Sequence, residues 1–279
     1  MQQEIIVDNS DFNGKKKFLS ISAWITVLRP AQWTKNLIVL ASFFFAYWDQ
    51  SKNQPLTTAN LLTSLFAVII FCGTSSGIYL LNDIKDLSAD RIHPLKRFRP
   101  IAAGIISIPS ALIVSGLLIG INGIISAFLS IRFTVLLMVY VILQMFYTFW
   151  LKRLPIVDIT IIATGFVIRA ISGAVVLNIT ISPWLLLCTF LLAIFLGLCK
   201  RRHEKLLLRE IGANHRAVLV LYDNKVLDQL ISICSSSVIV CYAIYTLWPD
   251  TVHKFGTSAM VYTVPVSYTH LTLPTIYSV

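Results

Sequence analysis

Charged residues are scarce in this chain of 279 residues: Asp, Glu, Lys and Arg make up 13% of it, and hydrophobic residues 56%. About a quarter of the residues in a soluble globular domain are charged. The charges that are present lie in groups between long apolar runs, and the mean hydropathy is +0.77. Apolar runs of about 18 residues or more can cross a bilayer as helices. The composition excludes an ordinary soluble domain and predicts an all-α, polytopic transmembrane helical bundle.

Cysteine is also sparse and offers no metal-binding pattern. None of the five cysteines forms a C-x-x-C pair, and all lie in or at the edges of apolar runs. Free cysteines in such surroundings usually act as small packing residues. No cleavable signal peptide is expected either, because the polar residues 1–17 lead into an interfacial stretch rather than a short apolar core.

Seven apolar segments are predicted as membrane spans: 36–49, 59–82, 108–127, 133–150, 156–177, 182–199 and 230–248. With the N-terminus inside, 19 of the 23 Lys and Arg residues fall on the cytoplasmic side, and only Lys52, Arg132 and Lys254 fall outside. An excess of Lys and Arg in short cytoplasmic loops sets orientation. This distribution explains the net charge of +10, so the lipid bilayer is the expected partner and nucleic acid is not.

The spans are expected to form one membrane domain over residues 1–265. Two longer polar segments, 82–104 and 200–228, fall on the cytoplasmic side and could together build a site there. The last residues, 266–279, contain no Asp, Glu, Lys or Arg and differ in composition from the rest of the chain. We expect this tail to be non-native and the C-terminus to be truncated.

The segment after the second expected span carries a cluster of oxygen ligands. If the helix continues, Asn82, Asp86 and Asp90 lie at i, i+4 and i+8 on one face, and Asp83 lies beside them. Mg²⁺ takes such ligands and usually keeps waters and substrate phosphates in its shell. The alternative is an acidic loop neutralised by nearby Lys and Arg. Acidic residues at the end of a span are costly and usually functional, which favours the metal.

Basic residues follow the acids and suit a phosphate-rich ligand. Lys96, Arg97 and Arg99 could bind phosphoryl oxygens; ordinary positive-inside anchoring is the alternative. Arg169 lies midway along an apolar span, where an unpaired guanidinium is expensive. It is predicted to face a cavity and bind phosphate, with a structural ion pair or snorkelling as the alternative.

These residues carry a resemblance to a known family. The N-x-x-x-D-x-x-x-D of Asn82 to Asp90 resembles the first aspartate-rich motif of the UbiA prenyltransferase superfamily. The longer string from Asn82 to Gly104, N-D-I-K-D-L-S-A-D-R-I-H-P-L-K-R-F-R-P-I-A-A-G, resembles its decaprenyl-phosphate phosphoribosyltransferase branch. So do L-R-P-A-Q-W-T-K-N at 28–36, Y-T-F-W-L-K at 147–152 and K-R-R-H-E at 200–204. The resemblance implies a UbiA-like bundle, of about nine spans in the full family, with a Mg²⁺-diphosphate site.

The resemblance also implies an activity. It implies Mg²⁺-dependent transfer of 5-phosphoribosyl from 5-phosphoribosyl 1-diphosphate to a polyprenyl phosphate of the decaprenyl type, with release of diphosphate. The product would serve synthesis of arabinan-type cell-envelope precursors. The expected location is the bacterial inner (cell) membrane, multi-pass, with the active site facing the cytoplasm and the oligomeric state left open.

Residue roles follow from the matching positions. Metal ligation is assigned to Asn82 and Asp86, catalytic roles to Asp83, Asp90 and Arg169, and substrate binding to Lys35, Tyr79, Lys96, Lys152, Arg169, Lys200 and Arg201. His93 is expected to shape the loop.

Two alternatives stay open. A UbiA enzyme that moves a prenyl group from a prenyl diphosphate to an aromatic acceptor would share the fold and the metal. That group usually has a second D-x-x-x-D motif, whereas residues 200–205 read K-R-R-H-E-K. A non-catalytic lipid-binding or transport protein is the other alternative. A transporter should carry polar sites at the membrane midplane in paired halves, whereas the acids here gather at one edge.

Overall fold

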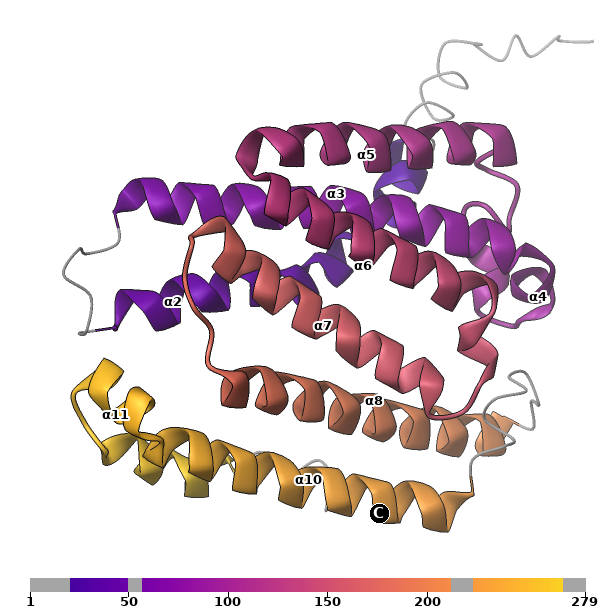
Figure 1. The fold of residues 1–279 in the computed structure, drawn as a ribbon. Helices are drawn as coiled ribbons and strands as arrows, with labels where there is room; N and C mark the ends of the chain where they lie inside the picture. Colours follow the sequence, from indigo (N-terminus) through magenta and orange to yellow (C-terminus); the bar gives the residue numbers. More distant parts are fainter. Residues whose placement is uncertain (1–20, 50–56, 212–222, 268–279) are drawn as a thin grey trace, which may run out of the picture. The chain divides into compact units, whose positions relative to one another are not determined.

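A computed structural model describes residues 21–49, 57–211 and 223–267, and regular secondary structure in these ranges is entirely helical (Figure 1). The elements are η1 (Pro30–Leu40), α2 (Ala41–Tyr47), α3 (Thr58–Lys85), α4 (Leu87–Ile92), η2 (Lys96–Phe98), α5 (Ile108–Leu129), α6 (Ile131–Phe149), η3 (Leu151–Arg153), α7 (Val157–Val176), α8 (Pro183–Ile211), α10 (Asn224–Leu247), α11 (Pro249–Phe255) and η4 (Ala259–Tyr262). Residues 268–279 of the expected non-native tail lie outside the described ranges.

Six helices are long and apolar enough to cross a membrane: α3, α5, α6, α7, the first 24 residues of α8, and α10. They match six of the seven predicted spans. The exception is 36–49, where the chain forms the 3₁₀ helix η1 and then the seven-residue helix α2. Long 3₁₀ segments are uncommon. Here the segment is fitted closely to α7, since the Ser42 hydroxyl donates to the carbonyl of Ala170 at 3.0 Å.

The chain forms two compact units, 1–34 with 72–122 and 35–71 with 123–279. In the first unit, the helical residues 21–28, the end of α3 and the start of α5 share one apolar core. Its buried members are Ala23, Val27, Leu80, Ile101, Ile106 and Ala111. This core fixes the chain on both sides of the acidic segment. The expectation of one domain over 1–265 remains a prediction.

In the second unit, α7 packs against α6 and α8, and α8 packs against α10 (Figure 1). A buried cluster of Ile159, Phe195, Leu198, Leu227 and Ile231 joins α7, α8 and α10. Gly197 permits the close approach of α8 to α7, because an added Cβ would lie 2.7 Å from Cγ2 of Ile159. This packing holds polar residues of α7 and α8 in fixed positions inside an apolar bundle.

Candidate functional site

Helical hydrogen bonding continues from α3 into α4 through the acidic segment. The backbone N–H of Asp86 donates to the carbonyl of Asn82 at 2.9 Å, and that of Asp90 to the carbonyl of Asp86 at 2.8 Å. Asn82, Asp86 and Asp90 therefore follow one another at intervals of one turn, as their spacing predicted. Asn82 and Asp86 are half-buried, whereas Asp83 and Asp90 are buried.

Two arginines neutralise the buried acids and form what we term the acid–arginine cluster: Arg29, Asp83, Asp90 and Arg99. The Arg29 guanidinium lies 2.5 Å from Oδ1 of Asp83. Nη1 of Arg99 lies 3.1 Å from the same oxygen and 2.6 Å from Oδ2 of Asp90. The Arg29 guanidinium also lies 5.0 Å from the centre of the Tyr79 ring. Both arginines stay partly exposed, so each keeps N–H donors for a ligand.

The backbone around this cluster is shaped by particular residues. Nδ1 of His93 accepts hydrogen bonds from the backbone N–H groups of Leu95 (3.2 Å) and Lys96 (3.3 Å), which agrees with the predicted loop-shaping role. Gly104 adopts φ +76°, a conformation that favours glycine. This turn lets the N–H of Ile105 donate to the carbonyl of Pro100 at 2.9 Å, which closes the loop that presents Arg99.

The residues present fit a magnesium ion whose coordination shell is filled partly by substrate oxygens and waters, and not by protein ligands alone. No group of three or more His, Cys, Asp or Glu side chains among the described residues is arranged to hold a metal. Asp83 and Asp90 are paired with arginines, and the predicted ligands Asn82 and Asp86 lie on the same helical run. Mg²⁺ is commonly held by one or two carboxylates together with substrate phosphates and waters. The ligand assignment therefore remains a prediction that this arrangement accommodates.

Arg169 lies in the second unit, on α7, and is 5% exposed. Its Nε donates to Oδ1 of Asn36 at 2.8 Å, Nη1 to the carbonyl of Gly165 at 3.0 Å, and Nη2 to the Tyr140 hydroxyl at 2.7 Å. The guanidinium also lies 4.6 Å from the centre of the Tyr140 ring. These partners are all neutral, so neither an ion pair to a described carboxylate nor snorkelling describes this residue. Its positive charge therefore has no ion-paired counter-charge among the described residues, and its phosphate-binding role stays a prediction.

Arg201 has a different environment, although it too is a predicted phosphate ligand. Its guanidinium lies 2.8 Å from Oδ2 of Asp158 and 2.8 Å from Oε2 of Glu204. Asp158 is completely buried, so this ion pair joins the start of α7 to α8. A structural role explains Arg201 without a ligand, and its substrate role remains a prediction.

The remaining predicted substrate ligands are four lysines, three of them on short 3₁₀ segments and one on α8. Lys35 on η1 and Lys200 on α8 are exposed, whereas Lys96 on η2 and Lys152 on η3 are half-buried. Exposure of this kind suits both substrate binding and anchoring at the membrane surface, so their substrate role stays a prediction.

Sequence reasoning did not identify Tyr140, and it named Asn36 only as part of a motif. A phenol and an amide in apolar segments are weak signals by themselves. A charged residue inside a predicted span is costly without a partner. The cost of burying Arg169 could therefore have prompted a search for polar residues in the other spans, and Tyr140 is one of them. Arg99 was considered both as a phosphate ligand and as one of the basic residues that could neutralise the acidic segment, and in the structure it pairs with Asp83 and Asp90.

Comparison with known proteins identifies the family. The sequence model of the UbiA prenyltransferase family matches residues 36–272. The chain is 35% identical over 237 residues to the decaprenyl-phosphate phosphoribosyltransferase of Mycolicibacterium smegmatis, covering 85% of this chain and 74% of that protein. It is 36% identical to the enzyme of the same name from Corynebacterium glutamicum, with 84% and 69% covered.

A solved structure shares the fold. It is a UbiA homologue from Archaeoglobus fulgidus bound to GPP and Mg²⁺, with a TM-score of 0.71 at 15% identity, covering 91% of this chain and 86% of that one. The likeness confirms the predicted polytopic helical fold. The chain belongs to the UbiA prenyltransferase family, as a multi-pass membrane enzyme similar to the decaprenyl-phosphate phosphoribosyltransferases.

Proposed function

We propose that this enzyme transfers 5-phosphoribosyl from 5-phosphoribosyl 1-diphosphate to a polyprenyl phosphate of the decaprenyl type and releases diphosphate. The observation that carries the proposal is the acid–arginine cluster in the same segment as Asn82 and Asp86, in a chain similar to two enzymes named decaprenyl-phosphate phosphoribosyltransferase. The product would enter synthesis of arabinan-type cell-envelope precursors, and the site would face the cytoplasm.

The acid–arginine cluster would bind the diphosphate of the donor. Asp83 and Asp90 each engage part of an arginine and fix its orientation, and the remaining N–H groups of Arg29 and Arg99 would donate to diphosphate oxygens. Asn82 and Asp86 would hold Mg²⁺. When bound, Mg²⁺ neutralises the charge that develops on the leaving diphosphate. Tyr79 and Lys96 would contact the ribose or its phosphates.

The acceptor needs little activation, because its phosphate oxygen is already an anion. That oxygen forms a bond to the anomeric carbon as the bond from this carbon to the diphosphate oxygen breaks, and diphosphate leaves with the electron pair. Positioning and electrostatic stabilisation then supply most of the rate. Arg169 would bind a phosphate, because it brings a buried positive charge that only neutral groups hold in place.

The test is transfer of radiolabelled phosphoribosyl diphosphate to polyprenyl phosphate in membranes that contain the protein and Mg²⁺. We expect label in the lipid phase, none after EDTA, and about 100-fold less in Asp86→Asn and in Arg169→Lys. Asp223→Asn and Arg132→Lys are matched controls, since both residues are exposed and far along the chain from the predicted ligands. Undiminished transfer in Asp86→Asn and after EDTA would contradict the metal site.

One observation favours a second candidate. The solved homologue that shares the fold is bound to GPP and Mg²⁺, so a prenyl diphosphate could be the donor and an aromatic compound the acceptor. The aromatic prenyltransferases usually hold a second metal cluster with a D-x-x-x-D motif in a later loop. Residues 200–206 contain one acid, Glu204, and it forms an ion pair with Arg201, which argues against a second metal cluster at these residues. Transfer of a labelled prenyl group, with no transfer of phosphoribosyl, would select this candidate. No product from either donor would leave the non-catalytic lipid-binding alternative.

A further inference from the structure

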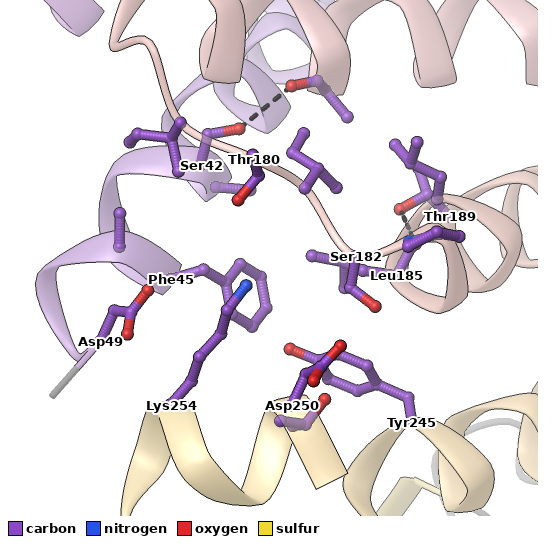
Figure 2. Close-up of a pocket in the computed structure, with 18 of the residues that line it drawn as sticks. Ser42, Phe45, Asp49, Thr180, Ser182, Leu185, Thr189, Tyr245, Asp250 and Lys254 are labelled. Atoms are coloured by element: carbon purple, nitrogen blue, oxygen red, sulfur yellow. Dashed lines mark hydrogen bonds between the residues drawn. The ribbon is translucent and has the colours of Figure 1, made fainter. Parts of the chain in front are cut away.

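A cavity of about 350 Å³ lies in the second unit, where α7 and α10 end and α8 begins (Figure 2). Its walls come from α2, the connection 179–182, the first turns of α8, the last turn of α10, and α11. Within this unit it lies at the opposite end of α7 and α8 from the Asp158–Arg201 ion pair. None of the predicted catalytic, substrate-binding or metal residues lines it, so the proposed reaction does not explain it.

Three charged side chains surround this cavity. Asp49 comes from the chain just beyond α2, and Asp250 and Lys254 come from α11, one turn apart. Figure 2 shows all three at the cavity, with Lys254 between the two aspartates in this view. Asp250 and Lys254 form no ion pair with one another or with any other described residue. Both signs of charge are therefore presented to whatever fills the cavity.

Tyr245 is the second feature that indicates a ligand. It is 4% exposed, and its side chain lines the cavity that Asp250 also lines (Figure 2). Among the described residues this hydroxyl has no hydrogen-bond partner. A buried tyrosine normally finds one. The other wall is apolar, formed by residues such as Ile38, Leu185 and Leu186, and suits a hydrocarbon chain.

Aromatic residues place the cavity at the level of the membrane–water interface. The Trp184 and Trp248 rings lie 5.4 Å apart at the start of α8 and the end of α10, and Trp248 lines the cavity. The Tyr47 and Trp48 rings lie 5.8 Å apart at the end of α2. Tyr and Trp concentrate at the headgroup level of a bilayer. A ligand at this depth has its polar part among headgroups and its apolar part among acyl chains.

We infer that this cavity binds the headgroup of an aminophospholipid, represented by phosphatidylethanolamine. Its ammonium would lie between Asp49 and Asp250, its phosphate would contact Lys254 and the Tyr245 hydroxyl, and one acyl chain would follow the apolar wall. A lipid with both charges matches the lining, whereas an anionic lipid would leave the Asp250 carboxylate without a counter-charge. In the expected orientation this end faces away from the cytoplasm, and the cavity shares no residue with the predicted site.

The experiment is native mass spectrometry of the purified protein released from nanodiscs made of phosphatidylethanolamine and phosphatidylglycerol in equal amounts. We expect one retained phosphatidylethanolamine on the wild type. Retention should fall about tenfold in Lys254→Gln and in Asp250→Asn, which each remove one charge-assisted contact. Lys254→Arg keeps the charge and should keep the lipid. Arg132→Gln and Asp223→Asn remove the same charges elsewhere on the exposed surface and should change nothing.

Three outcomes would overturn the inference. The first is no retained lipid on a monodisperse wild type, and the second is retention that is equal in all variants. The third is preferential retention of phosphatidylglycerol that Asp250→Asn does not reduce, which would indicate a phosphate site without ammonium recognition. Phosphoribosyl transfer is measured separately, so failure of the lipid site does not bear on the proposed reaction.

Discussion

At the residue scale, the arginines differ in what holds them. Arg29 and Arg99 are paired with buried acids at the end of a span, whereas Arg169 is held by an amide, a carbonyl and a phenol inside the bundle. Paired arginines stabilise the local fold and position N–H donors for a ligand. Arg169, whose partners are neutral, is the one that we propose binds a phosphate.

Arg99→Ala should destabilise the protein more than Arg97→Ala does. Asp83 would keep only Arg29, and Asp90 would lose the partner at 2.6 Å, leaving a buried carboxylate poorly compensated. We expect the free energy of unfolding to fall by about 2 kcal/mol, below the range for fully buried pairs because Arg99 is partly exposed. Thermal unfolding in detergent measures this. Arg97→Ala is the control, since Arg97 is exposed and stacks on Phe98, and an equal loss in both variants would contradict the argument.

At the element scale, the segment η1–α2 is positioned by its contact with α7. Val39 is completely buried, and a Cβ added to Gly173 would overlap its carbonyl oxygen. The same segment presents Asn36 to Arg169. Glycine at 173 therefore allows a close backbone approach that positions Asn36, one of the three hydrogen-bond partners of the buried Arg169 guanidinium.

Gly173→Ala should displace η1–α2 and reduce both stability and transfer. A methyl group forced against backbone costs about 1–3 kcal/mol, and movement of Asn36 would loosen Arg169. Gly120→Ala on α5 is the matched control, because nothing lies within 4 Å of its added Cβ and alanine favours a helix by up to about 1 kcal/mol over glycine. The measurements are the unfolding midpoints and transfer rates of the two variants. A Gly173→Ala protein as active and as stable as the wild type would contradict the proposed role of this close approach.

At the scale of the whole molecule, the charge between the six candidate spanning helices predicts an orientation. The acidic segment is proposed to face the cytoplasm, and the lipid cavity the opposite side. This arrangement would separate a water-soluble, phosphorylated donor from a structural lipid of the other leaflet.

Single-cysteine labelling tests this orientation. In a background without the five native cysteines, Ser88→Cys on α4 should react with a membrane-impermeant maleimide only in inside-out vesicles. Ser258→Cys should react only in right-side-out vesicles, and both positions are exposed. Reaction of both from the same side would contradict the proposed topology.

Local patterns in the sequence were enough to predict the membrane class, six of the spans, the family and the position of the acidic segment. The membrane class and the spans depend on apolar run length and on the charge between runs, and the position of the acidic segment depends on the one-turn spacing of Asn82, Asp86 and Asp90. The family depends on the resemblance of the string from Asn82 to Gly104 to a known motif. The exact pairing of the buried charges emerged only in the folded chain. There Arg99 pairs with Asp83 and Asp90, Arg201 pairs with Asp158 and Glu204, and Arg169 donates to a residue 133 positions away. The partner of a buried charge depends on which helices pack together, and no local pattern contains that information.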